Sequence, residues 1–158
     1  MGQKTFVPGG FPPAANLVKL GGNFLIASVI ECLGEAIALM RKADVPPHRF
    51  LEILTESLFS APVYKTYGRL ILEEQYQPAG FSMPLALKDL RSVLAAAEAK
   101  AVPMPVASLI HDRFLTEVAR GNGDLDWSAL ARLAAENAGL EPLTFKATGS
   151  ATSGADRD

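Results

Sequence analysis

The chain has 158 residues, of which 15 are Lys or Arg, 17 are Asp or Glu, and 49% are apolar. A chain of this length forms one domain with an ordinary hydrophobic core, and its single cysteine, Cys32, excludes an internal disulfide. The formal net charge of −2 excludes a strongly basic surface, so nucleic acid is not an expected partner.

The first residues, 1–13, are predicted to hold one short strand, Thr5–Val7, followed by a Pro-Gly-Gly turn. No later segment has a strand pattern with which this strand would pair. From Ala14 the pattern becomes helical and stays so to about Ala43, a length of about 45 Å at 1.5 Å per residue. A helix of this length with apolar residues on most sides predicts a central helix enclosed by others.

The most apolar stretch, 24–40, contains Glu31 and Glu35. Each ionised carboxylate at the centre of a bilayer costs roughly 2.5 kcal/mol or more, so a buried helix is favoured over a membrane span. The N-terminus also lacks the basic and apolar pattern of a secretory signal. We therefore expect a cytoplasmic protein.

Proline and glycine residues mark the expected starts and ends of further helices. Proline is tolerated in a first helical turn, Asp126 is a natural N-cap, and Gly121 and Gly139 are suited to the left-handed residue after a helix. From position 141 the chain has little to bury, which predicts a flexible tail over 141–158. The predicted fold is an all-α helical bundle around one long central helix, in a domain spanning 14–140. The further helices are expected at 47–57, 61–74, 84–100, 105–120 and 127–137.

Lys19 and Asn23 are four residues apart on the long helix, so both can contact one ligand. A lysine transfers protons near neutral pH only if its pKa, about 10.4 in water, is lowered by burial or a nearby cation. The alternative is a solvated surface pair. Lys88-Asp89, near the start of a later helix, likewise suits an anion or a pair of surface charges.

The other polar residues give weaker indications of a catalytic or metal-binding role. Glu31 and Glu35 suit either a carboxylate dyad or pairing with Arg or Lys, and Cys32 is expected to pack within its apolar helix. His48 and His111 have no ligand-type neighbours at metal-binding spacing, so no metal site is predicted. The chain also lacks G-x-G-x-x-G and G-x-x-x-x-G-K-[ST], so its own residues predict no nucleotide-binding loop.

Four segments stand out in order along the chain: GQKTFVPGGFPPAANLVKLGGNFLIASVIECLGEAIALMRKA, FSMPLALKDLRSVLAAA, VPMPVAS and GNGDLDWSAL. Together they resemble the C-terminal domain of the β-hydroxyacid dehydrogenase family, which includes 3-hydroxyisobutyrate dehydrogenase and the glyoxylate and succinic-semialdehyde reductases. The resemblance covers about residues 2–140 and implies the fold of the 6-phosphogluconate dehydrogenase C-terminal domain.

The resemblance implies roles for four residues. Lys19 of K-x-x-x-N matches the lysine that acts as general acid and base at the substrate oxygen, and Asn23 matches the asparagine bonded to that oxygen. Lys88 matches a lysine that contacts the cofactor, NAD or NADP, and Phe81 lies where the family has an aromatic residue near the substrate. Asp44 departs from the pattern, because a glycine commonly ends the long helix there; Asp tolerates the left-handed region, so the turn is expected to survive.

Family enzymes also carry an N-terminal Rossmann domain, whereas this chain starts at what resembles the last strand of that domain. The first hypothesis is therefore one half of an NAD(P)-dependent oxidoreductase acting on a short 3-hydroxy acid or aldehyde. This half is inactive alone, binds no cofactor tightly and is completed by a Rossmann domain. The second is a non-catalytic homodimerisation module, since the family's C-terminal domains form the dimer interface and this chain has a mean hydropathy of +0.17.

Overall fold

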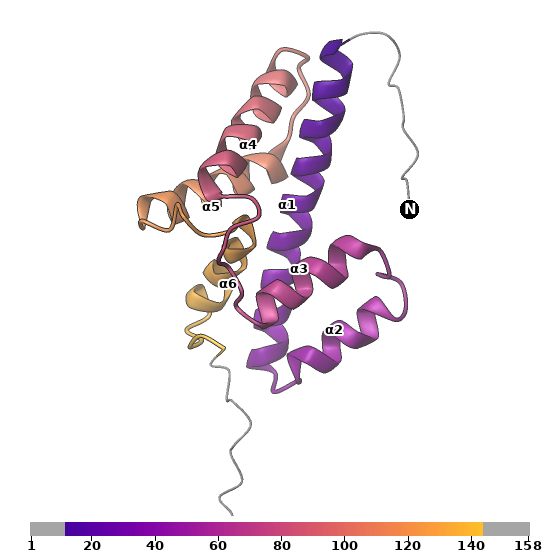
Figure 1. Cartoon of the computed structure of the whole chain (residues 1–158), viewed down its shortest axis with the longest axis vertical. Coiled ribbons are helices and arrows are strands. Elements are labelled where there is room, and N and C mark those ends of the chain that lie inside the picture. Colours follow the sequence, from indigo (N-terminus) through magenta and orange to yellow (C-terminus); the bar gives the residue numbers. More distant parts are fainter. Residues whose placement is uncertain (1–11, 144–158) are drawn as a thin grey trace, which may run out of the picture.

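The computed structural model describes residues 12–143, which fold into helices (Figure 1). Within that range the structure contains no strand, only an isolated bridge between Ser82 and Asp126, so the prediction of an all-α fold is confirmed. The predicted strand Thr5–Val7 lies outside the described residues. The helices are α1 (Pro12–Lys42), α2 (Pro47–Thr55), α3 (Pro62–Leu72), α4 (Met83–Glu98), α5 (Pro105–Ala119), the 3₁₀-helix η1 (Trp127–Ala131) and α6 (Arg132–Asn137).

The long helix α1 is the central helix of the domain, as predicted, but the expectation that other helices enclose it is wrong, because Val18, Leu25 and Leu39 are exposed. It packs against every other helix named above, and Figure 1 shows α4 running beside its N-terminal half and α2 and α3 beside its C-terminal half. Its packed face carries Ala27, Ile30 and Ile37, which are almost completely buried. The spacing of three and then seven residues returns to one helical face, so a single stripe of α1 supplies its share of the core.

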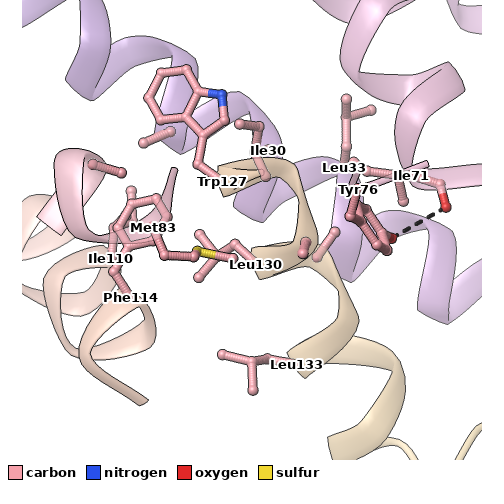
Figure 2. Close-up of a cluster of buried hydrophobic side chains, with 14 of the residues drawn as sticks. Ile30, Leu33, Ile71, Tyr76, Met83, Ile110, Phe114, Trp127, Leu130 and Leu133 are labelled. Atoms are coloured by element: carbon pink, nitrogen blue, oxygen red, sulfur yellow. Dashed lines mark hydrogen bonds between the residues drawn. The ribbon is translucent and has the colours of Figure 1, made fainter. Parts of the chain in front are cut away.

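The core lies where α1, α4, α5 and η1 meet. Figure 2 shows Ile30, Met83, Ile110, Phe114 and Leu130 converging there from these elements. All five side chains are fully enclosed. Burying an apolar side chain of this size stabilises the fold by about 1.5–3 kcal/mol, so this cluster holds the four elements together.

The last predicted helix, 127–137, is divided in the structure. The five residues of η1 are all buried, and Ala131 lies directly against Gly34 of α1, so tertiary packing sets a tighter 3₁₀ geometry before α6 begins. The N-cap at Asp126 is confirmed: its Oδ1 accepts hydrogen bonds from the Ser128 backbone N at 2.9 Å and from Ser128 Oγ at 2.6 Å.

Glycines end two helices in the predicted way. Gly121 (φ 84°) and Gly139 (φ 66°) adopt the left-handed conformation after α5 and α6. Asp44 (φ 57°) does the same after α1, as expected for Asp at this position. Two other non-glycine residues, Glu74 (φ 48°) and Ala101 (φ 54°), have the same conformation after α3 and α4.

Replacing Ala101 with glycine is expected to stabilise the domain. A left-handed alanine costs about 1–2 kcal/mol relative to its right-handed conformation, and glycine largely avoids that cost. Because the unfolded glycine has more conformational entropy, the expected net gain is about 0.5–1 kcal/mol. Urea denaturation measures it. The converse variant Gly121→Ala should lose stability; equal stability of A101G and the parent would contradict the prediction.

The first residues of the predicted tail are hydrogen-bonded to the helical domain. The Leu143 backbone N donates to Glu74 Oε1 at 2.8 Å, and the Glu141 carbonyl accepts from the Arg41 guanidinium. Residues 144–158 of the predicted tail lie outside the described part.

Helix α1 is long and apolar enough to cross a membrane by length and composition alone, with a mean hydropathy of 1.7 over its most apolar window. It packs against every other described helix, and 39% of that window is buried inside the domain. Glu31 in its middle is also ion-paired to Arg113 of α5 at 2.9 Å.

Candidate functional site

Lys19 and Asn23, the predicted site residues on α1, lie on the N-terminal side of the hydrophobic core. Asn23 and Lys19 continue the stripe that carries Ala27 and Ile30, one and two turns closer to the N-terminus. Asn23 is half-buried and Lys19 is exposed. The face that buries apolar side chains lower on the helix therefore presents polar ones here, beside α4.

Asn23 is held in place by α4. Its Nδ2 donates a hydrogen bond to Asp89 Oδ2 at 2.7 Å, across 66 positions of sequence. Bonds to a carboxylate are among the stronger hydrogen bonds. The carboxamide retains its second N–H and its Oδ1 for a ligand, so Asp89 orients Asn23 without using up its binding capacity.

Lys88 precedes Asp89 on α4 and is exposed. Within residues 12–143 neither Lys19 nor Lys88 forms an ion pair. Two predicted site residues on α1 and one on α4 thus lie on adjoining helices. The sequence did not reveal Asp89 as the link between them.

Phe81 lies two residues before the start of α4. Its ring packs edge-on against Trp127 with 4.7 Å between centroids, and its carbonyl accepts from the Trp127 backbone N at 2.8 Å. It lines a pocket of about 430 Å³ together with Tyr67 of α3 and Trp127, whereas Lys19, Asn23 and Lys88 do not line it. Asp89 lies six positions after Met83, which is about 9 Å along α4, so the pocket lies some distance from the Asn23 amide.

The carboxylates of Glu31 and Glu35 are paired with a basic residue, one of the two expected arrangements. Arg113 of α5 lies 2.9 Å from Glu31 Oε1 and 3.7 Å from Glu35 Oε1. Burial raises the pKa of Glu31, while Arg113 opposes that shift. The pair therefore joins α1 to α5.

The expectation that Cys32 packs inside its helix is wrong for the described chain, because the residue is exposed on the outer side of α1. Its pKa is raised, first by partial burial and then by Glu35 and Glu31, so the thiol is favoured over the reactive thiolate. For metals, the described residues contain no group of three or more His, Cys, Asp or Glu side chains placed to bind an ion.

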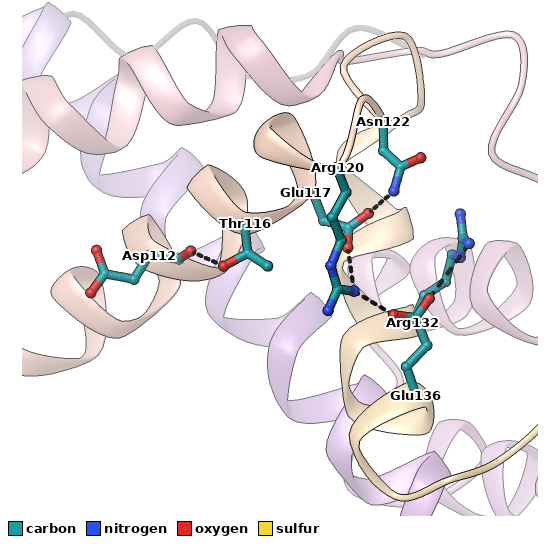
Figure 3. Close-up of polar contacts among 7 residues, drawn as sticks. All are labelled: Asp112, Thr116, Glu117, Arg120, Asn122, Arg132 and Glu136. Atoms are coloured by element: carbon teal, nitrogen blue, oxygen red, sulfur yellow. Dashed lines mark hydrogen bonds and ion pairs between the residues drawn. The ribbon is translucent and has the colours of Figure 1, made fainter.

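A second polar cluster surrounds Glu117 at the end of α5 (Figure 3). Glu117 is fully buried, and its Oε2 accepts from Asn122 Nδ2 at 2.7 Å. Its Oε1 lies 3.7 Å from Arg120, whose guanidinium also pairs with Glu136 of α6. The cluster ties the end of α5 to the following turn and to α6.

Glu117 is expected to make stability depend on pH. Burial raises the pKa of its carboxyl above the unfolded value of about 4.3, although Asn122 partly opposes this. The folded state therefore binds the proton more tightly, so this contribution to stability falls as pH rises from about 4 through the raised pKa. Urea midpoints measured across that range for the parent and Glu117→Gln should diverge with pH; parallel curves would contradict the prediction.

Comparisons with known proteins match this arrangement to one family. The profile described as "NAD-binding of NADP-dependent 3-hydroxyisobutyrate dehydrogenase" matches residues 13–134. An uncharacterized oxidoreductase, YfjR, of Bacillus subtilis is 39% identical over 132 residues, which are 84% of this chain and 46% of that protein. Glyoxylate/succinic semialdehyde reductase 1 of Arabidopsis thaliana is 31% identical over 130 residues, 82% of this chain and 44% of the reductase.

Solved structures share the fold. A 3-hydroxyisobutyrate dehydrogenase from Salmonella typhimurium matches with a TM-score of 0.70 and 24% identity, over 77% of this chain and 42% of that one. The Mycobacterium tuberculosis 3-hydroxyisobutyrate dehydrogenase, solved with L-serine, matches with a TM-score of 0.67 and 23% identity, over 76% of this chain and 43% of that one. The chain spans less than half the length of these relatives. With the profile covering most of the helical domain, the chain belongs to the family of 3-hydroxyisobutyrate dehydrogenase-like oxidoreductases that use NAD or NADP.

Proposed function

We propose that this chain is the substrate-binding and subunit-contacting domain of a cytoplasmic NAD(P)-dependent oxidoreductase acting on a short 3-hydroxy acid or aldehyde. The observation that carries the proposal is the hydrogen bond from Asn23 of α1 to Asp89 of α4, which joins the helix that carries Lys19 to the helix that carries Lys88. Asp89 fixes the Asn23 amide, which leaves one donor and one acceptor for the substrate oxygen.

Lys19 handles the proton in this proposal. One helical turn separates it from Asn23, so its ammonium group and the Asn23 amide can approach the same oxygen. During reduction of a carbonyl, Lys19 Nζ gives a proton to the oxygen; during oxidation of the alcohol it takes that proton back. Asn23 holds the oxygen at the distance this transfer requires.

The cofactor contact assigned to this chain is Lys88. An exposed ammonium with no ion-pair partner among residues 12–143 is suited to a phosphate group of a dinucleotide. The nicotinamide, when bound, supplies or accepts the hydride at the substrate carbon. Positioning a dinucleotide also needs the glycine-rich turn of a Rossmann domain, and the sequence has no such motif. The proposal therefore assigns most cofactor binding to a Rossmann domain outside this chain.

Reconstitution tests the proposal. The chain is mixed with the Rossmann domain of a related dehydrogenase, or fused to it, and NADH or NADPH oxidation is followed with short aldehydes and 3-oxo acids. Turnover is expected in the mixture and not with either component alone. A mixture that forms a stable complex yet shows no turnover with either cofactor would refute the assignment.

A second proposal, association into a homodimer, is supported by the outer face of α1. Val18, Leu25, Cys32 and Leu39 recur every seven residues along this helix, and all four are exposed. An exposed apolar stripe along a whole helix is typical of an interaction surface. If this were the only function, the chain would dimerise and ignore nucleotides.

Light scattering coupled to size-exclusion chromatography measures this association. The parent chain is expected to be a dimer and Leu25→Glu a monomer. Leu58→Glu provides the matched control, because Leu58 is 90% exposed on the turn between α2 and α3, away from the stripe. A monomeric parent chain at high micromolar concentration would refute the homodimer.

A further inference from the structure

The pocket beside Phe81 has the size and lining of a small-molecule site. It lies between α3 and the segment that leads into α4, and its volume is about 430 Å³. Pockets that hold small ligands fall in the range of about 300–1,000 Å³ and combine aromatic walls with a few polar groups. Here Tyr67, Leu70, Phe81 and Trp127 form apolar walls.

The aromatic walls are fixed by contacts with each other. Trp127 packs edge-on against both Tyr67 and Phe81, with centroids 5.8 Å and 4.7 Å away, and its Nε1 donates to the Tyr67 hydroxyl at 3.1 Å. Such a network holds the rings in one arrangement, so a ligand meets a preformed surface.

The pocket offers no counter-ion to an anion. Among residues 12–143, no Lys, Arg or His lines it. Arg69, which reaches the lining residue Gln75 at 3.2 Å, is already paired with Glu73 at 2.8 Å. The one ionisable acid in the lining is Asp126, and each of its carboxylate oxygens accepts two hydrogen bonds.

We propose that this pocket binds an uncharged planar group, such as an aromatic ring or a carboxamide, and rejects a carboxylate. The ring stacks against the aromatic walls, while the Thr66 hydroxyl provides a donor and an acceptor. The Gln77 Nε2 donates to Asp124 Oδ2 at 2.8 Å, which leaves its second N–H and its Oε1 for the ligand. A carboxylate would lose hydration without gaining a cation. The group is either a substituent of the substrate, which rests on the function proposed above, or a separate small molecule.

The isolated chain provides a direct readout, because Trp127 is its only tryptophan and lines the pocket. Its fluorescence is titrated with benzamide and benzoate, which differ in charge and little in shape. Benzamide is expected to saturate with a dissociation constant of about a millimolar, as befits so small a ligand. Benzoate is expected to bind at least ten-fold more weakly. No saturable response to benzamide, or equal binding of benzoate, would overturn the proposal.

A charge introduced into the wall should reverse the selectivity. Thr66 is exposed on α3 and lines the pocket, so Thr66→Lys adds an ammonium group without disturbing the core. This variant is expected to bind benzoate more tightly than benzamide. Thr116→Lys, at an exposed position of α5 outside the lining, should keep the parent's preference. A reversal in both variants, or in neither, would contradict the assignment of the site.

The reconstituted enzyme distinguishes the two sources. Competitive inhibition by benzamide against the aldehyde identifies a substrate substituent, whereas inhibition that substrate does not relieve identifies a separate ligand. Both results support the proposal that the pocket binds an uncharged planar group. Because binding to the isolated chain needs no turnover, failure of the reconstitution would refute the proposed enzyme and leave this test intact.

Discussion

Replacing Lys19 with methionine is expected to lower the kcat of the reconstituted oxidoreductase by about 10²–10⁴-fold, the usual contribution of a general acid or base. Methionine keeps the length and apolar stem of the side chain and removes its proton. Lys19 is exposed and has no ion-pair partner within the described chain, so the free energy of unfolding should change by less than about 0.5 kcal/mol.

The measurement compares kcat and urea stability for this variant with those of Lys42→Met. Lys42 is also an exposed lysine of α1 but lies at the opposite end of the helix from Lys19. The control should keep full activity. Equal kcat values for the two variants would remove Lys19 from the mechanism, whereas a large loss in both would indicate that α1 itself has been damaged.

Local chemistry was enough to predict most of the helix boundaries. Proline opens α2 at Pro47 and α5 at Pro105, at the predicted positions, because a first turn does not need the missing N–H. Helices α3 and α4 end two residues earlier than predicted. Each ends near a left-handed residue that is not glycine, Glu74 or Ala101, so the sequence carries no stop signal there.

The candidate site was predictable only as separate pieces. The spacing of Lys19 and Asn23 places them on one helical face, and resemblance to a family suggests their chemistry. The bond between Asn23 and Asp89 depends on how α1 packs against α4, which no local pattern encodes. The pocket around Trp127 arises in the same way, because residues 66–81 and 126–127, which are far apart in the sequence, line it together.

The way the helices pack also explains why Cys32 is exposed. A helix that is apolar on most sides does not reveal which side faces the core. Packing decided it by placing Ile30 and Ile37 inside and leaving Cys32 exposed. The side of α1 that packing leaves exposed is apolar, and this is the reason for testing Leu25 in the dimer experiment.

Replacing Gly34 with alanine is expected to destabilise the domain by about 2–3 kcal/mol, at the upper end of typical overpacking costs. A Cβ at Gly34 would lie 2.7 Å from the Ala131 Cα, a backbone atom that cannot turn aside. Helix α1 and η1 would have to separate, and the buried contacts of Leu130 and Trp127 would loosen with them.

Gly22→Ala provides the control with the opposite sign. It lies on the same helix, but a Cβ there meets nothing within 4 Å in the described chain. Alanine is favoured over glycine in a helix by about 1 kcal/mol, so this variant should gain stability. Urea denaturation of both variants measures the difference. If Gly34→Ala were as stable as the parent while Gly22→Ala gained stability, the close approach of α1 to η1 would not be what holds the two elements together.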